Sequence, residues 1–190
     1  PTVHSQIASQ WQSANQDYLD GIVIKPIDGA GCVDTAFFNT TLDAKQYLQD
    51  SPSAAKASLI VQPYIKGTPA SLSLLMSDNT VRVLSINRQQ IQHYHSRLIF
   101  QGSTVNAIPD SELSLKAAQS LAENIHRLIP GLWGFVGIDL VLTPSGPIVI
   151  EINPRLTSSY IELKSTLNIN PTDLLIEYMS EKISTRFVSS

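Results

Sequence analysis

The sequence has few charged residues, few aromatic residues and a single cysteine. Charged side chains make up 15% of the 190 residues, well below the roughly 25% usual in soluble chains. The surface must therefore rely on Ser, Thr, Asn and Gln. The hydrophobic content of 43% is enough for a core and argues against intrinsic disorder. With Cys32 alone, an internal disulfide framework and a cysteine-based zinc site are both excluded.

The chain also lacks a basic block and a long uninterrupted apolar run. Thirteen basic residues against sixteen acidic ones give a net charge of −3, so neither a nucleic-acid nor an anionic-membrane partner is indicated. The longest nearly uncharged stretch, 128–150, contains four glycines, three prolines and Asp139. This composition predicts two buried strands joined by a turn rather than a membrane span. No signal-peptide pattern is visible, and we expect a cytoplasmic protein.

The pattern of apolar and turn residues predicts an α+β fold with antiparallel strands. Strands are expected over 22–25, 59–65, 70–76, 81–87, 135–142 and 148–152. Helices are expected over 41–50, from Asp110 or Ser111 to 128, over 160–167 and over 172–182. Residues 88–110 are polar and are expected to be irregular. We expect two lobes of one domain, 1–88 and 89–190.

The strongest chemical signal is a set of polar residues within the last two predicted strands. Asp139 interrupts an apolar run, and Glu151 and Asn153 alternate with isoleucines. A buried carboxylate is costly unless it is paired or bound to metal, and alternation places Glu151 and Asn153 on one face. Two carboxylates and an amide oxygen suit Mg²⁺ with retained waters. Arg155, two residues further on, offers a guanidinium for a phosphate or carboxylate.

Each of these four residues alone would be read as an ordinary surface side chain of a sheet. Together they favour a metal–anion site over that interpretation.

Two weaker signals lie earlier in the chain. Lys25 precedes a loop with Gly29 and Gly31, and glycines allow backbone amides to approach phosphates. A plain hairpin turn explains this loop equally well, because no Gly-Lys-Ser/Thr follows as in a Walker A loop. The strand that contains Gln62 could hold the edge of a purine, but by itself it is better explained as an ordinary strand.

Taken in order, these segments resemble the ATP-grasp superfamily. "GIVIKPIDGAGC" resembles the strand, lysine and glycine loop of the small lobe, and "LIVQPYIKG" resembles the strand that holds adenine. "GFVGIDLVLTPSGPIVIEINPR" resembles the paired strands with the metal ligands. Within the superfamily, "GTPASLSLL", "LSINRQQI" and "EINPRLTSSYIEL" are most similar to the tyramine–glutamate ligase group. The implied fold is two α+β lobes with antiparallel sheets that clasp ATP.

The resemblance also implies roles for individual residues. Lys25 would contact the α- and β-phosphates, and Arg155 would steady the acyl phosphate or its attacking partner. Asp139, Glu151 and Asn153 would hold Mg²⁺, with Mn²⁺ as a second suitable cation. The lid over the triphosphate would consist of Gly29, Ala30, Gly31 and Cys32. Adenine would be held by Gln62, Pro63, Tyr64 and Ile65. Substrate contacts would come from Asn87, Arg88, Gln89 and Arg155.

The implied reaction is ATP-dependent activation of a carboxylate as an acyl phosphate, followed by attack of an amine and release of ADP and phosphate. Glutamate and a tyramine-like amine are the leading substrates. The alternative is a nucleotide-binding or subunit-interaction module without turnover, favoured by Pro69, which stands where many members have a glutamate for the ribose. We expect the upstream domain of the family, with its further lysine, to be the chain's partner and to be needed for full activity. A homodimer is left open.

Overall fold

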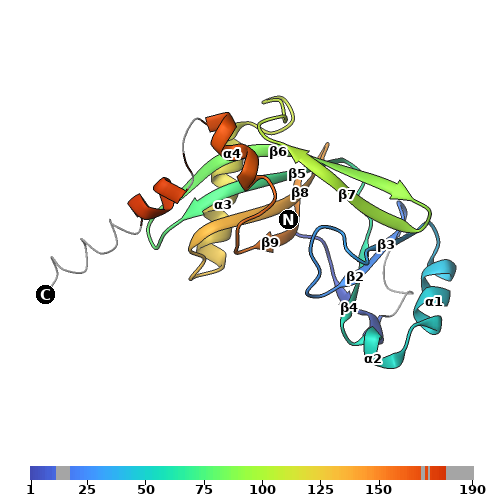
Figure 1. Ribbon diagram of the computed structural model, residues 1–190. Helices are drawn as coiled ribbons and strands as arrows, with labels where there is room; N and C mark the ends of the chain where they lie inside the picture. The colour runs from blue at the N-terminus through green and yellow to red at the C-terminus, as the bar shows by residue number, and fades with distance from the viewer. Residues whose placement is uncertain (12–17, 168–169, 171, 179–190) are drawn as a thin grey trace, which may run out of the picture. The chain divides into compact units, whose positions relative to one another are not determined.

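The computed structural model describes residues 1–11, 18–167, 170 and 172–178 (Figure 1). Its contacts divide the chain into two compact units that are discontinuous in sequence. Unit 1 contains Pro1–Gly67, Gln90–Gly102 and Thr143–Ile148, and unit 2 contains Thr68–Gln89, Ser103–Leu142 and Val149–Ser190. This division differs from the continuous ranges 1–88 and 89–190, because residues 68–88 belong with the later strands.

Unit 1 is built on short antiparallel strands. They are β1 (Gln6–Ile7), β2 (Ile22–Pro26), β3 (Ala36–Phe38) and β4 (Leu59–Pro63), and their order is β1-β4-β2-β3, followed by β7 (Arg97–Thr104). Ile22, Ile24 and Val61 are fully buried and form its core with Ala36. β-branched side chains favour strands, which explains why the run 22–24 forms the centre of this sheet.

Helix α1 (Thr41–Asp50) covers this core with Ala44 and Leu48. Its start is fixed by Thr40, whose Oγ1 accepts a hydrogen bond from the Asp43 amide at 3.1 Å. This side-chain cap satisfies a donor that the helix itself leaves unpaired. The short η1 (Ala8–Gln10) and α2 (Ser53–Lys56) complete the helices of the part of unit 1 that the structure describes.

Unit 2 contains longer strands: β5 (Thr68–Met76), β6 (Val81–Tyr94), β8 (Gly134–Thr143) and β9 (Gly146–Asn153). Their order is β6-β5-β8-β9, and β5 pairs antiparallel with both β6 and β8. A tight turn connects β5 with β6, in which the Ser77 amide donates to the Thr80 carbonyl at 2.8 Å. Strands β6, β7, β8 and β9 each have residues in both units, since 90–102 and 143–148 belong to unit 1.

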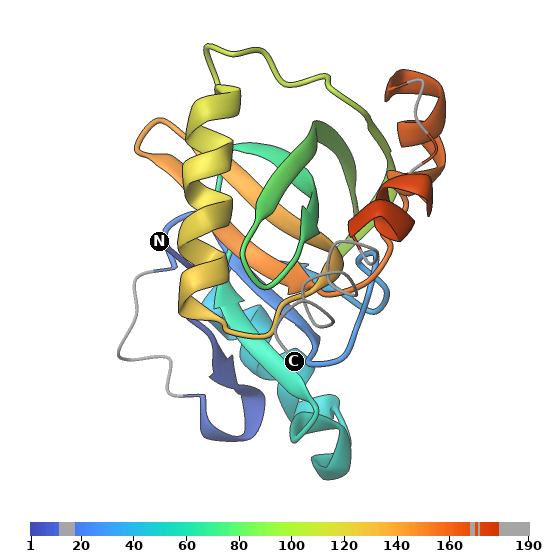
Figure 2. The same ribbon diagram turned by 90° about the vertical axis from the view of Figure 1, so that its left-hand side faces the viewer.

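Helices cover both faces of the strands of unit 2 (Figure 2). Helix α3 (Leu115–Leu128) packs Ala118, Ala122 and Ile125 against one face. Helix α4 (Tyr160–Leu167) packs Leu163 against the other, together with Leu75 of β5. A further helical segment covers 172–178, and the predicted continuation to 182 lies outside the described residues. Among the residues that the structure describes, no helix is long and apolar enough to cross a membrane.

Two expectations about local structure were wrong. Most of 88–110 is not irregular, because β6 continues to Tyr94 and β7 returns from Arg97 to Thr104. Only the turn at 95–96 and residues 105–110 lie outside regular structure in this range. Helix α3 begins at Leu115 and is capped by Ser114, whose Oγ accepts from the Ala117 amide at 3.2 Å. Residues 109–113 form a turn instead, in which the Leu113 amide donates to the Pro109 carbonyl.

Candidate functional site

Two of the polar residues expected at a metal site, Asp139 on β8 and Asn153 on β9, are hydrogen-bonded to each other in unit 2. The Asn153 amide donates from Nδ2 to Oδ2 of Asp139 at 3.2 Å. Asn153 is 7% exposed, and Asp139 and Glu151 are half-buried. Glu151 precedes Asn153 by two residues on β9, so the two side chains share a face of the sheet. The structure therefore joins the carboxylate of Asp139 to the amide of Asn153.

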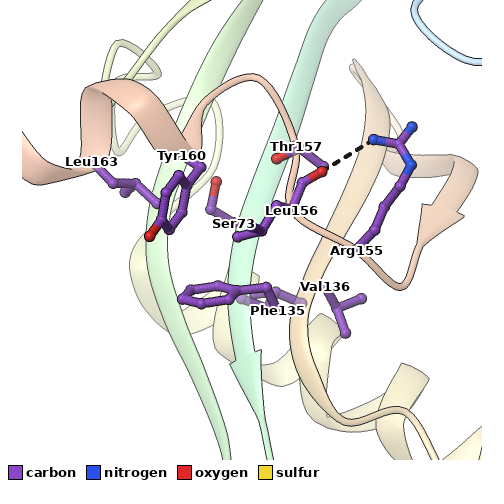
Figure 3. Close-up of a pocket in the computed structure, with 9 residues that line it drawn as sticks. Ser73, Phe135, Val136, Arg155, Leu156, Thr157, Tyr160 and Leu163 are labelled. Carbon is purple, nitrogen blue, oxygen red and sulfur yellow. Dashed lines mark hydrogen bonds between the residues drawn. The ribbon is translucent and has the colours of Figure 1, made fainter. Parts of the chain in front are cut away.

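Arg155 is connected to the same group. Its backbone amide donates to the Asn153 carbonyl at 2.8 Å, so the chain turns tightly after β9. Its Nη2 donates to Oδ1 of Asn153 at 3.2 Å, and its Nη1 donates to the Leu156 carbonyl at 3.1 Å (Figure 3). The side chain is exposed. A guanidinium held on one edge by two acceptors still presents further donors to an anion.

Gln89, expected to contact substrate, is hydrogen-bonded to Asp139, the predicted metal ligand. Its Nε2 donates to Oδ1 of Asp139 at 2.8 Å. The two oxygens of Asp139 are thus contacted by two different amides, from Gln89 on β6 and from Asn153 on β9. A contact between residues 50 positions apart cannot be read from spacing along the chain.

Asn87 and Arg88 lie in different surroundings from Gln89. Asn87 is fully buried, and its Nδ2 donates to the hydroxyls of Ser71 and Ser73 at 3.3 and 3.1 Å. Arg88 is on the opposite face of β6 by alternation and forms an ion pair with Glu112 at 2.8 Å. This hydrogen bond to Arg88, with a further one to Thr68, lowers the pKa of Glu112. The structure does not bring Arg88 together with Asn87 and Gln89.

A chain of hydroxyls that the sequence interpretation missed joins the buried Ser73 and Ser159 to the half-buried Thr157. Ser73 and Ser159 are hydrogen-bonded at 2.8 Å, and Ser159 and Thr157 at 2.9 Å. Two signals in the sequence point to it: serines at 71 and 73 within an apolar strand, and the hydroxyl run at 157–159 directly after Arg155.

A small hollow of about 10 Å³, partly open to solvent, adjoins these hydroxyls. Figure 3 shows Tyr160 and Phe135 packed near one another at one side of the hollow, with Arg155 at the other. The ring centroids of Phe135 and Tyr160 are 5.5 Å apart. The hollow is lined by Ser73, Leu74, Phe135, Val136, Arg155, Leu156, Thr157, Tyr160 and Leu163.

The side chains of Asp139, Glu151 and Asn153 offer oxygen ligands of the kind that suit a hard divalent cation. The described residues contain no group of three or more His, Cys, Asp or Glu side chains that could hold a metal. A cation held here would therefore use the carboxylates of Asp139 and Glu151, the amide oxygen of Asn153, and water. Magnesium commonly binds through one or two carboxylates with several waters retained, so this donor set suits it.

The predicted phosphate-binding residues lie in unit 1. Lys25 is half-buried on β2 and is paired in register with Ile60 of β4. The glycine loop connects β2 with β3, which pair antiparallel, so it is the loop of a hairpin. Gly31 and Cys32 both have a φ of 61°, a left-handed conformation that Gly31 adopts without cost. Ala30 and Gly31 are exposed, while Gly29 and Cys32 are half-buried.

The predicted adenine-binding residues follow each other at the end of β4, also in unit 1. Gln62 is 5% exposed, and its Nε2 donates to the Ser5 hydroxyl at 2.7 Å. Pro63, Tyr64 and Ile65 are half-buried. The Tyr64 hydroxyl is 3.1 Å from Nε2 of His93. Burial raises the pKa of Tyr64 above its usual 10.0, and the nearby Asp20 carboxylate raises it further.

Comparison with known protein families matches a part of the chain that contains the predicted metal-binding, phosphate-binding and adenine-binding residues. Residues 7–159 match the model of the ATP-grasp domain family. The chain belongs to this family.

Two curated relatives are similar to this chain in sequence. The chain is 32% identical over 120 residues to a tyramine–L-glutamate ligase of Methanocaldococcus jannaschii, covering 63% of this chain and 36% of the relative. It is 30% identical over 158 residues to the tyramine–L-glutamate ligase of Methanocaldococcus fervens, covering 82% and 43%. The chain thus spans less than half the length of these curated relatives.

Among solved structures, the fold is similar to a D-alanine–D-alanine ligase from Bacillus anthracis complexed with ATP. The TM-score is 0.64 at 15% sequence identity, with 98% of this chain and 63% of that chain covered. At this identity the similarity confirms the α+β ATP-grasp fold. The predicted fold class and family are therefore both confirmed.

Proposed function

We propose that the chain is the ATP-grasp part of an ATP-dependent carbon–nitrogen ligase. The observation that carries this proposal is the joined group of Asp139, Asn153 and Arg155 in a member of the ATP-grasp family. The reaction we propose is transfer of the γ-phosphoryl group of ATP to a carboxylate, followed by attack of an amine on the acyl phosphate. ADP and phosphate are the products, and the cytoplasm is the proposed setting.

The chain's own residues would act by positioning and by neutralising charge. Lys25 would bind the α- and β-phosphates, and the backbone amides of the glycine loop would hold the triphosphate. Asp139, Glu151 and Asn153 would hold Mg²⁺, or Mn²⁺, which offsets charge on the phosphates. Arg155 would hold the acyl phosphate through the donors that Asn153 and Leu156 leave available. Such preorganised charge is the main source of catalysis in phosphoryl transfer.

The substrates we propose are glutamate and a tyramine-like amine. The support is that two relatives, which match 63% and 82% of this chain, are tyramine–L-glutamate ligases. Turnover would show this directly: ADP forms only when both the acid and the amine are present.

A nucleotide-binding module without ligase turnover is the second candidate. It is favoured by Pro69, half-buried on β5, where many family members have a ribose-binding glutamate. A module of this kind binds Mg·ATP but produces no ADP in response to any acid–amine pair.

Calorimetric titration with ATP, with and without Mg²⁺, tests the nucleotide site. For Glu151→Ala we expect the Mg²⁺-dependent gain in ATP affinity to fall by more than about 10-fold, with an unchanged fold by circular dichroism. Glu177→Ala, which removes an exposed carboxylate from the segment 172–178, is the matched control. Unchanged affinity in Glu151→Ala would refute the metal assignment.

Lys25→Ala tests the phosphate role separately. We expect it to weaken ATP much more than adenosine, because only ATP has phosphates for the ammonium group to bind. Lys116→Ala, at an exposed position on α3, is its control. Equal losses for ATP and adenosine would contradict a phosphate contact.

A further inference from the structure

We propose that Gln89 is a positioning residue for Asp139, which it orients for a divalent cation without cancelling the charge of the carboxylate. This inference rests on the proposed function, because it assumes that Asp139 is a metal ligand. It assigns Gln89 a role other than the substrate contact expected from the sequence.

The first argument is geometric. Gln89 lies on β6 and Asp139 on β8, and β5 lies between these strands. Neighbouring strands are about 4.8 Å apart, so the Gln89 side chain must extend across β5 to place its Nε2 2.8 Å from Oδ1 of Asp139. The residue of β5 in register with Asp139 is Ser71, a small residue over which a long side chain can pass.

The second argument concerns the number of contacts to the carboxylate. Oδ1 of Asp139 accepts from Gln89, and Oδ2 accepts from Asn153. Hydrogen bonds to both oxygens, from opposite sides along the sheet, fix the rotation of the carboxylate group. Partners of this kind orient metal ligands and contribute strongly to metal affinity.

The third argument is electrostatic. A lysine or arginine in place of Gln89 would also donate to Asp139, but its positive charge would repel a cation at the same carboxylate. An amide donates a hydrogen bond and has no net charge. Gln89 therefore supplies the orienting contact without adding a positive charge beside Asp139.

The experiment measures Mn²⁺ binding to the intact protein in the presence of ATP, by calorimetry and by electron paramagnetic resonance. Gln89→Met removes the donor and keeps the length of the side chain, and we expect about 10-fold weaker Mn²⁺ binding. Gln89→Lys keeps a donor and adds charge, and we expect weaker Mn²⁺ binding than in Gln89→Met. Gln92→Met is the matched control, since Gln92 on the same strand accepts from Gln101 and not from this group.

Thermal unfolding without metal separates positioning from a merely structural role. In Gln89→Lys, the new ammonium group should pair with Asp139. We therefore expect this variant to unfold at or above the wild-type temperature but to bind Mn²⁺ poorly. If Gln89 had only a structural role, Gln89→Lys would have both the thermal stability and the Mn²⁺ affinity of the wild type. Wild-type Mn²⁺ affinity in either folded variant would overturn the inference and leave the metal site standing. Absence of Mn²⁺ binding in the wild type would overturn the metal site itself, and the inference with it.

Discussion

Gly137 on β8 allows the loop after β9 to approach the sheet closely. It lies two residues before Asp139 and is in register with Ser73 of β5. A Cβ atom at position 137 would lie 2.3 Å from Cγ2 of Thr157 and 3.5 Å from its Cβ and Oγ1. Among these atoms, only the methyl group of Thr157 lies too close for a Cβ atom at position 137. The contact places the residues after Arg155 directly over the strand that contains Asp139.

We expect Gly137→Ala to destabilise the protein by about 1–3 kcal/mol, the usual range for overpacking. Thr157→Ser removes the interfering methyl group and keeps the hydroxyl that is bonded to Ser159. In the Thr157→Ser background, the same Gly137→Ala substitution should cost much less. Chemical denaturation of the four proteins of this double-mutant cycle measures the coupling. Additive effects would show that Thr157 does not limit the space at Gly137.

At the scale of single residues, the sequence predicted which types of residue form the candidate site but not which of them are hydrogen-bonded to each other. Asp139 and Asn153 were recognisable because polar residues rarely interrupt buried strands, and Arg155 because it follows Asn153 by two residues. The structure joins all three. The contact of Gln89 with Asp139 was not predictable, because it depends on which strands are neighbours. Strand order is set by the packing of the whole sheet rather than by local propensity.

At the scale of elements, the segment between β9 and α4 is attached to β5 by buried hydroxyls. Ser159 is 3% exposed and is bonded to both Ser73 and Thr157. Ser159 also accepts, through its carbonyl, from the amides of Glu162 and Leu163 in the first turn of α4. Ser159 thus links the start of this helix to the sheet.

Ser159→Ala should therefore loosen α4 locally. We expect a loss of about 1 kcal/mol in stability, the usual contribution of one hydrogen bond, and faster amide hydrogen exchange over 160–167. Ser158→Ala, at the exposed neighbouring position, provides the comparison. If exchange in α4 is the same in both variants, the hydroxyl chain does not hold the helix.

The elements that were not predicted share a physical cause. In β6 beyond Asn87, and in β7, most side chains are exposed or half-buried, so no apolar alternation marks them as strands. Their stability comes from backbone pairing and from contacts such as that of Gln101 with Gln92 at 3.1 Å. Strands β1 and β3, of two and three residues, are too short to give a periodic signal. By contrast, α1 and α4 were predicted within their observed bounds.

At the scale of the whole molecule, each unit has a hydrophobic core of its own. Ile24 belongs to the core of unit 1, and Leu140 to a core of unit 2. Their exposed fractions are 0% and 1%. Because local unfolding follows compact units, a cavity in one core should affect that unit first.

Ile24→Ala and Leu140→Ala test this independence. Each should cost about 2–5 kcal/mol of stability, as expected for truncation of a buried aliphatic side chain. In Ile24→Ala, amide exchange should increase mainly in β2, β4 and α1, and in Leu140→Ala mainly in β5, β8 and α3. Leu42→Ala and Leu128→Ala, which truncate leucines that are 76% and 79% exposed, control for each unit. An equal increase in both units from either core variant would mean that the chain unfolds as one cooperative body, because destabilisation of one core would then be transmitted in full to the other.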